Sequence, residues 1–368
     1  MTDSRCVPEH VFAEVARFDA TLSIEAASPP PASWYLDPAF LSLERSTTFR
    51  GWQFVGRLDQ VARPGDYFSG SVVQRPYIVV RDQEGDLRAF YNVCSHRGTC
   101  VARGSGTLEH FTCPYHGWEF HLSGGLKRAP LAGAVDEFKK RTVGLQSIPV
   151  AALGPFVLLH FGEGEADLGR SFAQFSTELE ALAMDSLKFV VRKVFELDCN
   201  WKVFVDNYVD GGYHVPHMHP ALNSSLMFDE YSSRMGDIYS VQSCPAKGGD
   251  RIGDMGQFVW VHPNFMINRY GSWMDTNLVL PVDADRCEVI FDYYHDGEIG
   301  EEDLASALQE SAKVQEEDTE VVDMVQAGLR SGVYRGVYAS RFEAPLYQFH
   351  RLLSADFGSP RGPSGTAG

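Results

Sequence analysis

Two cysteine–histidine pairs constrain this chain more than any other feature of its sequence. The first pair is Cys94-x-His96 and the second is Cys113-x-x-His116, with sixteen residues between His96 and Cys113. Each pair follows a run of strand-forming residues and lies among turn-forming residues, so we expect two loops that meet at their tips. Together the loops offer two thiolates and two imidazoles to one metal centre.

Two kinds of metal centre use such ligands. A structural zinc site with two cysteines and two histidines usually takes both cysteines from one half of its motif. Here each half supplies one cysteine and one histidine. A [2Fe–2S] cluster in which two histidines replace two cysteines on one iron fits this arrangement better, and the histidines raise its reduction potential. We therefore predict a one-electron carrier here, with structural zinc as the alternative.

A second group of metal-binding residues lies in NWKVFVDNYVDGGYHVPHMHP, residues 200–220. His214 and His219 are five positions apart, so a straight helix would not place them on one face. A broken helix, which the Gly-Gly step at 211–212 permits, can direct both side chains inward. Two histidines and one carboxylate, with further positions open, form the facial triad of non-haem Fe(II) oxygenases. His217 has no place in this triad, and we interpret it as an outer or surface residue.

The missing carboxylate is predicted on a long helix that begins at Glu301 and is closed by Gly328 or Gly332. At about 100° per residue, an apolar stripe runs along this helix and Asp318 falls near its centre. A carboxylate that faces the core needs a partner, so Asp318 is the predicted third ligand. The stripe consists of Val314, Val321, Val322, Val325 and Leu329, and the acids expected to face solvent are Glu316, Glu320 and Asp323.

Composition and charge exclude several classes of protein. The chain has 368 residues, 44% of them hydrophobic and 22% charged, as in a globular protein of two domains. Its formal charge of −17 argues against a nucleic-acid partner and agrees with a solubilising surface. The start has no secretion signal, and the most apolar stretch, residues 148–161, is too short to cross a membrane. We expect a cytoplasmic protein that binds neither nucleic acid nor membrane.

Strand and helix patterns indicate how the chain is divided. The segment YIVVRDQEGDLRAFYNV, residues 77–93, predicts two strands joined by a turn at 84–86. The later segment RCEVIFDYYHD, residues 286–296, alternates as a strand with Val289, Phe291 and Tyr293 on one face. We expect an α+β protein with an N-terminal segment at 1–48, uncommitted before residue 30, a β domain at 49–155, a mixed domain at 156–357 and a flexible tail at 358–368.

The first two boxes, with Arg97-Gly98 and the run CPYHGW at 113–118, resemble a Rieske domain of the oxygenase type. Rieske proteins of respiratory complexes have an extra cysteine in each box, and the two form a disulfide. Here Tyr115 occupies the second such place, so Cys100 has no partner. The resemblance implies a mainly β Rieske [2Fe–2S] domain inserted near the N-terminus of a helix-grip catalytic domain, which combines an antiparallel sheet with helices.

The second segment resembles the catalytic domain of Rieske non-haem iron oxygenase alpha subunits. Their motif is Asn-x-x-Asp, then His, four residues and His; Asn207, Asp210, His214 and His219 match it with one extra residue after Asp210. The family resemblance implies a homotrimer in which one subunit's cluster feeds the mononuclear iron of the next subunit through a bridging acid. By position this acid is Asp210, bonded to the His116 imidazole across the interface. The extra residue leaves Asp206 as a stand-in.

Further motifs between Trp34 and Leu353 are similar to the choline monooxygenase-like members of this family. They include RGWQFVGR, HPNFMINRYGSWM, VIFDYYHD and VQEEDTEVVDMVQAGL. The resemblance implies a Rieske cluster, mononuclear Fe(II) and O2 as co-substrate. The chain has no convincing strand–GxGxxG–helix unit for a nicotinamide or flavin, so electrons from NAD(P)H are expected through a separate reductase or ferredoxin.

The expected reaction converts choline to the hydrate of betaine aldehyde. The alternatives are N-demethylation of another quaternary or tertiary amine, such as a betaine or carnitine-like compound, and, from a different class, an electron carrier with an inactive second site. A quaternary ammonium group favours an aromatic cage. The aromatic residues available for it are Phe258, Trp260, Phe265, Tyr270, Trp273, Tyr293 and Tyr294.

Overall fold

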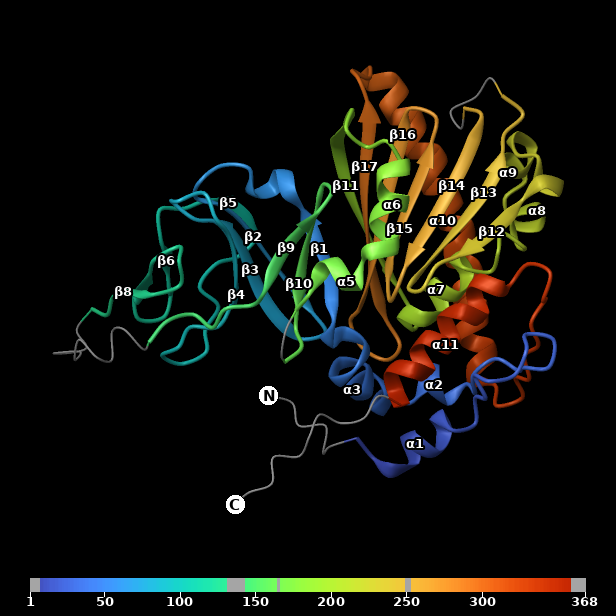
Figure 1. Cartoon of the computed structure of the whole chain (residues 1–368), viewed down its shortest axis with the longest axis horizontal. Coiled ribbons are helices and arrows are strands. Elements are labelled where there is room, and N and C mark those ends of the chain that lie inside the picture. Colours follow the sequence, from blue (N-terminus) through green and yellow to red (C-terminus); the bar gives the residue numbers. More distant parts are fainter. Residues whose placement is uncertain (1–6, 131–142, 164–165, 249–252, 359–368) are drawn as a thin grey trace. The chain divides into compact units, whose positions relative to one another are not determined.

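The computed structural model describes residues 7–130, 143–163, 166–248 and 253–358. Contacts divide the chain into two compact units, residues 49–176 and residues 1–48 with 177–368. We call the first the inserted unit and the second the catalytic unit (Figure 1). Most of the predicted C-terminal tail, residues 359–368, lies outside the described residues.

The inserted unit is mainly β. Its first sheet has the order β1-β10-β9, its second β4-β3-β2-β5 and its third β6-β7-β8. The strands are β1 (Trp52–Arg57), β2 (Asp66–Val72), β3 (Arg75–Arg81), β4 (Leu87–Tyr91), β5 (Ser105–Thr107), β6 (Phe111–Thr112), β7 (Glu119–Phe120), β8 (Leu126–Arg128), β9 (Val150–Leu153) and β10 (Phe156–His160), with short helices η2 (Thr48–Arg50), η3 (Leu58–Val61) and α5 (Leu168–Ser171). The predicted hairpin at 77–93 is confirmed, because β3 and β4 pair antiparallel.

The end of the inserted unit differs from the expected boundary at residue 155. That boundary would separate β9 from β10, yet these strands pair with each other, and β10 also pairs with β1. The unit therefore continues to Ser176. The pairing of β10 with β1 joins segments about a hundred residues apart, and local patterns carry no signal for it.

The catalytic unit contains a seven-stranded antiparallel sheet with the order β11-β17-β16-β15-β14-β13-β12. The strands are β11 (Leu187–Leu197), β12 (Ser232–Met235), β13 (Tyr239–Pro245), β14 (Met255–Val261), β15 (Phe265–Tyr270), β16 (Trp273–Pro281) and β17 (Cys287–Asp296). The helices are α1 (Glu9–Val15), α2 (Ser33–Leu36), α3 (Pro38–Ser46), α6 (Ala173–Ala181, which spans the boundary), α7 (Trp201–Tyr208), α8 (Val215–Met218), α9 (Pro220–Ser225), η4 (Phe228–Glu230), α10 (Glu301–Arg330) and α11 (Ala344–Gly358). The predicted α+β class is confirmed.

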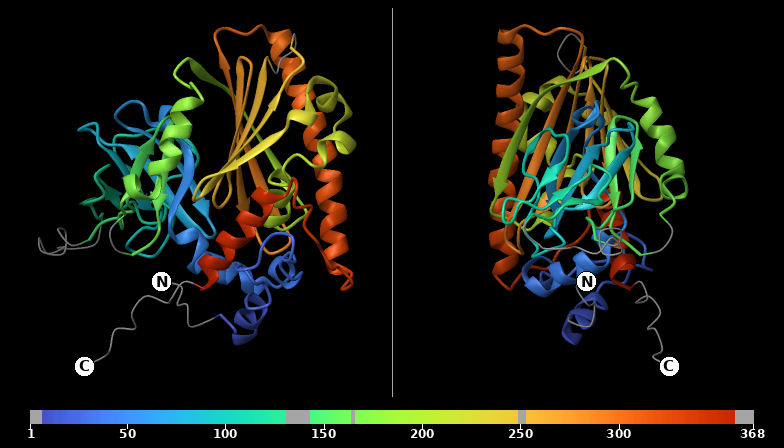
Figure 2. Two further views of the ribbon diagram at one scale, coloured as in Figure 1. Left: turned by 45° about the vertical axis from the view of Figure 1, so that its right-hand side comes forward. Right: turned by 90° about the vertical axis from the view of Figure 1, so that its left-hand side faces the viewer.

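The helix α10 runs along one face of this sheet (Figure 2). The Tyr293 hydroxyl of β17 lies 2.8 Å from the Ser311 hydroxyl of α10. The Trp260 ring of β14 packs edge-on against Phe349 of α11, with centroids 5.4 Å apart. We call this side the helix-covered face.

The buried stripe of α10 is rotated from the one predicted. Its buried residues are Ala307, Gln315, Val322, Gln326 and Leu329. Val325, expected in the core, is 45% exposed, so that part of the prediction is wrong. The true stripe includes two glutamines, which a purely apolar pattern cannot reveal. Glu316, Glu320 and Asp323 are exposed as expected.

Residues 7–30 are more ordered than the sequence suggested. Residues 9–15 form α1, Val11 is fully buried, and Phe18 packs edge-on against Trp34 and Tyr347. This helix is too short to be stable alone. It forms because α11, more than three hundred residues later in the chain, supplies its apolar partner.

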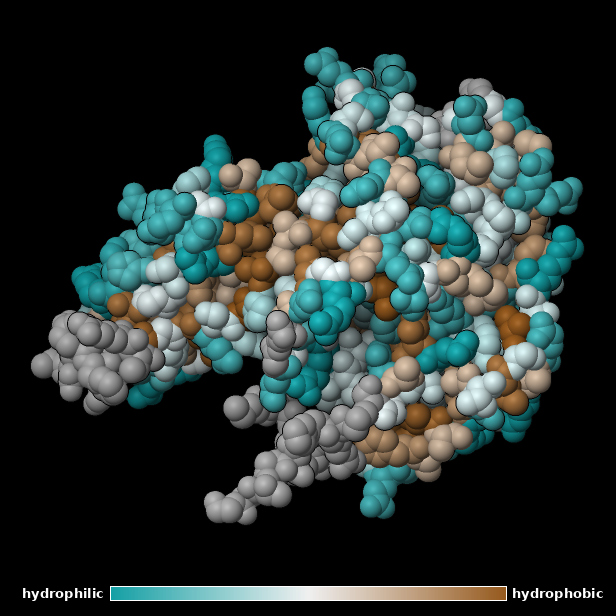
Figure 3. Space-filling view, in the orientation of Figure 1, coloured by the Kyte–Doolittle hydropathy of each residue, from teal (hydrophilic) through white to brown (hydrophobic). Residues whose placement is uncertain are grey.

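The described residues contain no helix that is both long and apolar enough to cross a membrane. Hydrophilic side chains are spread over much of the face shown in Figure 3, in agreement with the excess of acidic residues in the chain.

A buried ion pair anchors α7 to α3. The Lys202 ammonium donates to the Glu44 carboxylate, which also accepts from Trp201 Nε1 at 2.9 Å. Both charged side chains are essentially inaccessible. Burial lowers the pKa of Lys202 and raises that of Glu44, and the attraction between them opposes both shifts. Neither charge is tolerable there without the other.

We expect Lys202→Met to destabilise the protein by about 3–5 kcal/mol, because Glu44 would be left as an unpaired buried charge. The double variant Glu44→Gln/Lys202→Met should recover most of this loss, since it removes both charges and keeps an acceptor for Trp201. Denaturant unfolding followed by tryptophan fluorescence measures both, with exposed Lys193→Met as the control. An equal loss in the single and double variants would contradict this account.

Candidate functional site

The two cysteine loops of the inserted unit have the same backbone geometry. In each loop the N–H four residues after the cysteine donates to the cysteine carbonyl, and the cysteine N–H donates to the carbonyl one residue further on. The residues at the fourth position are Gly98 and Gly117, with φ of 80° and 68°. Because such φ values favour glycine, these turns depend on it. Cys94 and Cys113 are thus held in matching positions.

Of the four predicted cluster ligands, the two cysteines are buried and the two histidines are exposed. Cys94 and Cys113 are each 2% exposed and belong to the core of the inserted unit. His96 and His116 are exposed, with ring centroids 4.6 Å apart, and His96 stacks on the Trp118 ring. Burial raises the pKa of Cys94, and the adjacent Cys113 thiol adds to this shift. A buried thiol pair beneath an exposed imidazole pair matches a [2Fe–2S] cluster with two cysteines on one iron and two histidines on the other.

The helix that carries the second motif is broken, as predicted. The helix α7 ends at Tyr208, and Gly211 and Gly212 follow with φ of 77° and 69° before α8 begins at Val215. A Cβ atom on Gly211 would lie 1.9 Å from the Phe342 carbonyl oxygen, and one on Gly212 would lie 2.6 Å from the Tyr231 ring. Both conformation and space therefore require glycine at these positions.

This break brings the three predicted iron ligands together. One ligand atom from each of His214, His219 and Asp318 lies within 4.8 Å of the others. The Asp318 Oδ1 atom is 3.1 Å from His219 Nε2 and 3.9 Å from His214 Nε2. Asp318 lies on α10, whereas His214 directly precedes α8 and His219 directly follows it. Two imidazole nitrogens and one carboxylate so close together are the ligand set of a non-haem iron facial triad.

Each of these three side chains has its own hydrogen-bond partner. The Asp210 Oδ2 atom lies 2.7 Å from His214 Nδ1 and also accepts from the His214 backbone N–H. The Asn207 side-chain amide donates to Asp318 Oδ1 at 2.8 Å. The Glu317 Oε2 atom lies 2.7 Å from His219 Nδ1. Such outer contacts orient metal ligands.

Glu317 is the site residue that the sequence reasoning missed. It directly precedes Asp318, so the two side chains project about 100° apart on α10. The only sequence signal was the row of acids from Glu316 to Asp318. Choosing among them requires the position of His219, which local patterns do not give.

The site attracts positive charge. Burial by itself lowers the pKa of His219, but the hydrogen bonds and charges of Asp318 and Glu317 outweigh it and raise the pKa above its ordinary value. These carboxylates favour a proton on His219 when no metal is bound. A divalent cation would take the place of that proton.

Asp206 lies outside this group of residues. Its Oδ2 accepts from the Tyr35 hydroxyl at 2.7 Å and its Oδ1 lies 3.0 Å from His350 Nε2. His350 Nδ1 is in turn 2.7 Å from the Tyr338 hydroxyl. Asp206 therefore links α7 to α2 and α11, whereas the acid in contact with His214 is Asp210. His217 is exposed, as one of its two interpretations required.

The strand register shows which face of the sheet carries each aromatic residue expected to form a cation cage. Tyr270 pairs with Trp273, Asn268 with Phe258 and Asp275 with Tyr293, so these side chains share one face of the sheet. The contacts of Trp260 and Tyr293 with α11 and α10 identify it as the helix-covered face. The pool on this face is Phe258, Trp260, Tyr270, Trp273 and Tyr293, whereas Phe265 and Tyr294 point to the opposite face.

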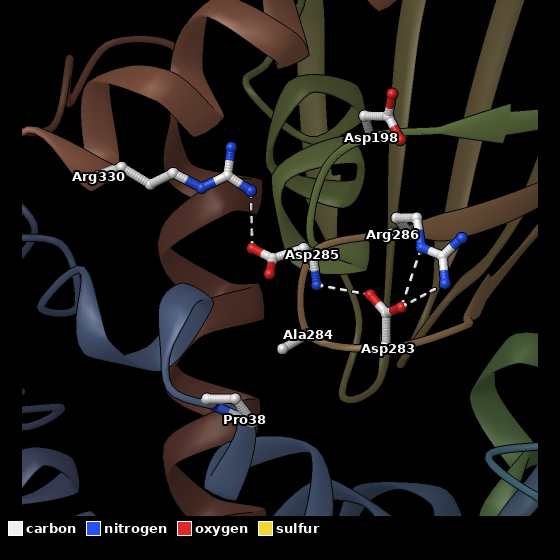
Figure 4. Close-up of a pocket in the computed structure, with 7 residues that line it drawn as sticks. All are labelled: Pro38, Asp198, Asp283, Ala284, Asp285, Arg286 and Arg330. Carbon is white, nitrogen blue, oxygen red and sulfur yellow. Dashed lines mark hydrogen bonds and ion pairs between the residues drawn. The ribbon is translucent and has the colours of Figure 1, made fainter.

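A pocket of about 560 Å³ lies elsewhere in the catalytic unit and contains none of the predicted site residues. Figure 4 shows Asp283 turned toward Arg286 and Asp285 turned toward Arg330. Because these charges pair with each other, we assign no ligand to this pocket.

Comparison with known proteins agrees with the geometry. Residues 51–139 match the Rieske [2Fe-2S] domain family, and residues 184–356 match the family of the ring hydroxylating alpha subunit (catalytic domain). The chain is 41% identical to the chloroplastic choline monooxygenase of Arabidopsis thaliana, over 94% of this chain and 88% of that protein. It is 29% identical to the carnitine monooxygenase oxygenase subunit of Acinetobacter pittii, over 83% and 86% of the two chains.

The fold is also similar to that of a solved quaternary ammonium Rieske monooxygenase. The TM-score is 0.84 at 26% identity, over 91% of this chain and 97% of the other. Both family matches and the full-length similarity to curated relatives agree on one assignment. The chain belongs to the Rieske non-haem iron oxygenases, as an alpha subunit and a monooxygenase whose cofactors are a Rieske [2Fe–2S] cluster and a mononuclear iron.

Proposed function

We propose that this enzyme hydroxylates the alcohol carbon of choline and forms the hydrate of betaine aldehyde. The observation that carries the proposal is the 41% identity to a choline monooxygenase over 94% of the chain, together with the convergence of His214, His219 and Asp318. The reaction consumes choline, O2, two electrons and two protons, and releases the hydrate and water. The electrons come from NAD(P)H through a separate reductase or ferredoxin.

The residues would share this work as follows. Cys94, Cys113, His96 and His116 would hold the cluster, and His214, His219 and Asp318 would hold the iron. When bound, the cluster supplies electrons one at a time and the iron activates O2. The chain itself provides a facial set of three ligands, which leaves room for O2, and outer hydrogen bonds that keep these ligands in place.

Asp210 is the proposed bridge for electrons between subunits of a homotrimer. Its carboxylate is already bonded to His214 Nδ1, and its side chain is 14% exposed. The His116 imidazole is exposed in each subunit and would be the donor from the neighbour. The similar quaternary ammonium Rieske monooxygenase has been described in terms of inter-subunit electron transfer. A hydrogen bond from His116 of a neighbouring subunit to Asp210 would connect the two metal centres.

A quaternary ammonium substrate suits the chemistry of the catalytic unit. Aromatic rings on the helix-covered face, among them Phe258 and Tyr270, are half-buried and offer π-faces to a cation. The formal charge of −17 favours the approach of a positively charged molecule. Choline has a single primary alcohol carbon, and its hydroxylation keeps the trimethylammonium group intact.

A second candidate substrate is a carnitine-like amine. The chain is 29% identical to a carnitine monooxygenase oxygenase subunit, and one solved quaternary ammonium Rieske monooxygenase, 26% identical to this chain, holds L-carnitine. Against an electron carrier with an inactive second site stands the intact set of three ligands, each with its own hydrogen-bond partner.

Single-turnover oxidation by the reduced holoenzyme tests the substrate. Choline, glycine betaine, carnitine and γ-butyrobetaine are each mixed with the enzyme and O2, and the products are identified by mass. We expect betaine aldehyde from choline and no formaldehyde. Formaldehyde release from a methylated amine, with choline unchanged, would favour the N-demethylase instead. Oxidation of none of these would exclude this substrate class.

Asp210→Asn should leave both metal centres loaded and nearly abolish turnover, because the amide cannot replace the charged link between the two centres. Iron content, the visible spectrum of the cluster and choline oxidation measure this together. Asp206→Asn, four residues earlier in the chain, is the matched comparison and should act mainly on stability. Turnover like that of wild type in Asp210→Asn would remove this residue from the bridging role.

His214→Ala should lose the mononuclear iron and keep the visible spectrum of the cluster, because the two sites have separate ligands. The neighbouring His217→Ala removes an exposed imidazole and should keep both. Iron quantification per chain distinguishes one lost iron from three. Loss of the cluster spectrum in His214→Ala would contradict the separation of the sites.

A further inference from the structure

Glu317 contacts the Nδ1 atom of His219, the ring nitrogen away from Asp318. Its Oε2 lies 2.7 Å from Nδ1, while Asp318 Oδ1 lies 3.1 Å from Nε2 on the other side of the ring. The imidazole is therefore held between two successive side chains of α10. His219 is 2% exposed, so water does not compete strongly for either nitrogen.

The contact with Glu317 selects the tautomer of His219. An ionised carboxylate can only accept hydrogen bonds. A neutral imidazole bonded to it at Nδ1 must carry its proton on that nitrogen, which leaves the lone pair on Nε2. The Nε2 atom is the one that lies 3.1 Å from Asp318 Oδ1. The tautomer selected by Glu317 is thus the one that can bind the iron.

Glu317 and Asp210 differ in what else they hold. Asp210 bonds His214 Nδ1 and accepts from the backbone N–H groups of Tyr213 and His214. It therefore also fixes the turn before α8. Glu317 lies on the regular helix α10, which needs no side-chain acceptor at that point. The contact of Glu317 with His219 serves the ligand and not the backbone.

We propose that Glu317 is the positioning residue of the buried iron ligand. It fixes the orientation and tautomer of His219, and by drawing on the Nδ1 proton it makes Nε2 a stronger donor to the metal. This role is independent of the electron transfer assigned to Asp210. The inference rests on the iron site of the proposed function. It states that Glu317, which is not one of the three ligands, affects how tightly the iron is held and the ligand field that the iron experiences.

Metal titration of the full chain with its cluster loaded tests this role. Mononuclear metal is removed, Co(II) is added as the probe, and its visible absorption reports both affinity and ligand field. We expect Glu317→Ala and Glu317→Gln to bind Co(II) about 10–100-fold more weakly, as is typical when an outer partner of a metal-bound histidine is lost. Their Co(II) spectra should change, while the cluster spectrum stays the same.

Two matched controls lie on the same helix. Glu316→Gln and Glu320→Gln each remove one exposed negative charge within three residues of Glu317, and should bind Co(II) as wild type does. Glu317→Asp restores a carboxylate that is shorter by one methylene and should recover part of the affinity. If Glu317 had a purely structural role, its replacement would lower the temperature of thermal unfolding. The Co(II) spectrum of the folded fraction would then stay unchanged.

The possible outcomes separate this inference from the iron site itself. Wild-type affinity and spectrum in Glu317→Gln or Glu317→Ala would overturn it, as would an equal loss in the two exposed controls. If Glu317→Ala does not fold, Glu317→Gln decides the matter, because it keeps the shape and removes the charge. If wild type takes up no Co(II), or His219→Ala takes it up equally well, the metal site of the proposed function fails first.

Discussion

The break between α7 and α8 is the constraint on which the catalytic unit depends. Gly211 and Gly212 both adopt positive φ, and both lie where a Cβ atom would collide with the Phe342 carbonyl or the Tyr231 ring. The chain can turn there only with glycine, and the turn places His214 before α8 and His219 after it. A continuous helix would separate the two imidazoles, and the carboxylate of α10 would then have no pair of nitrogens to join.

Contacts with α2, α3 and α11 hold the helix α7 in place. Lys202 is paired with Glu44 in a fully buried contact, and Asp206 binds both Tyr35 and His350. The first of these contacts comes from α3 and the second from α2 and α11, so both ends of the chain support one short helix. Asn207 lies next to Asp206 and donates to Asp318. The contacts that hold α7 therefore also help to position Asp318, the proposed iron ligand.

The carboxylates of the proposed iron site have separate partners. Asp318 is the proposed ligand, Asp210 holds the more exposed histidine and is suited to a link with a neighbouring subunit, and Glu317 holds the buried one. The side chain of His214 is 19% exposed and that of His219 is 2% exposed. In the proposed mechanism, electrons would reach the site through the more exposed histidine, and the buried histidine would retain the metal. The close negative charges also explain why the metal-free site favours a proton on His219.

The sequence alone determined those features that depend on short spacings. The two cysteine–histidine boxes, the broken helix at Gly211 and Gly212, the alternation of β17 and the extent of α10 all follow from residues within a few positions of one another. Local chemistry and the fixed periods of helices and strands are enough for these. Only the tertiary structure decided the partners of side chains distant in sequence: Glu317 with His219, Asp206 with Tyr35 and His350, α1 with α11, and β10 with β1. The same holds for the exposure of Val325, because the rotation of α10 about its axis is set by what packs against it, and packing between distant segments leaves no period in the sequence.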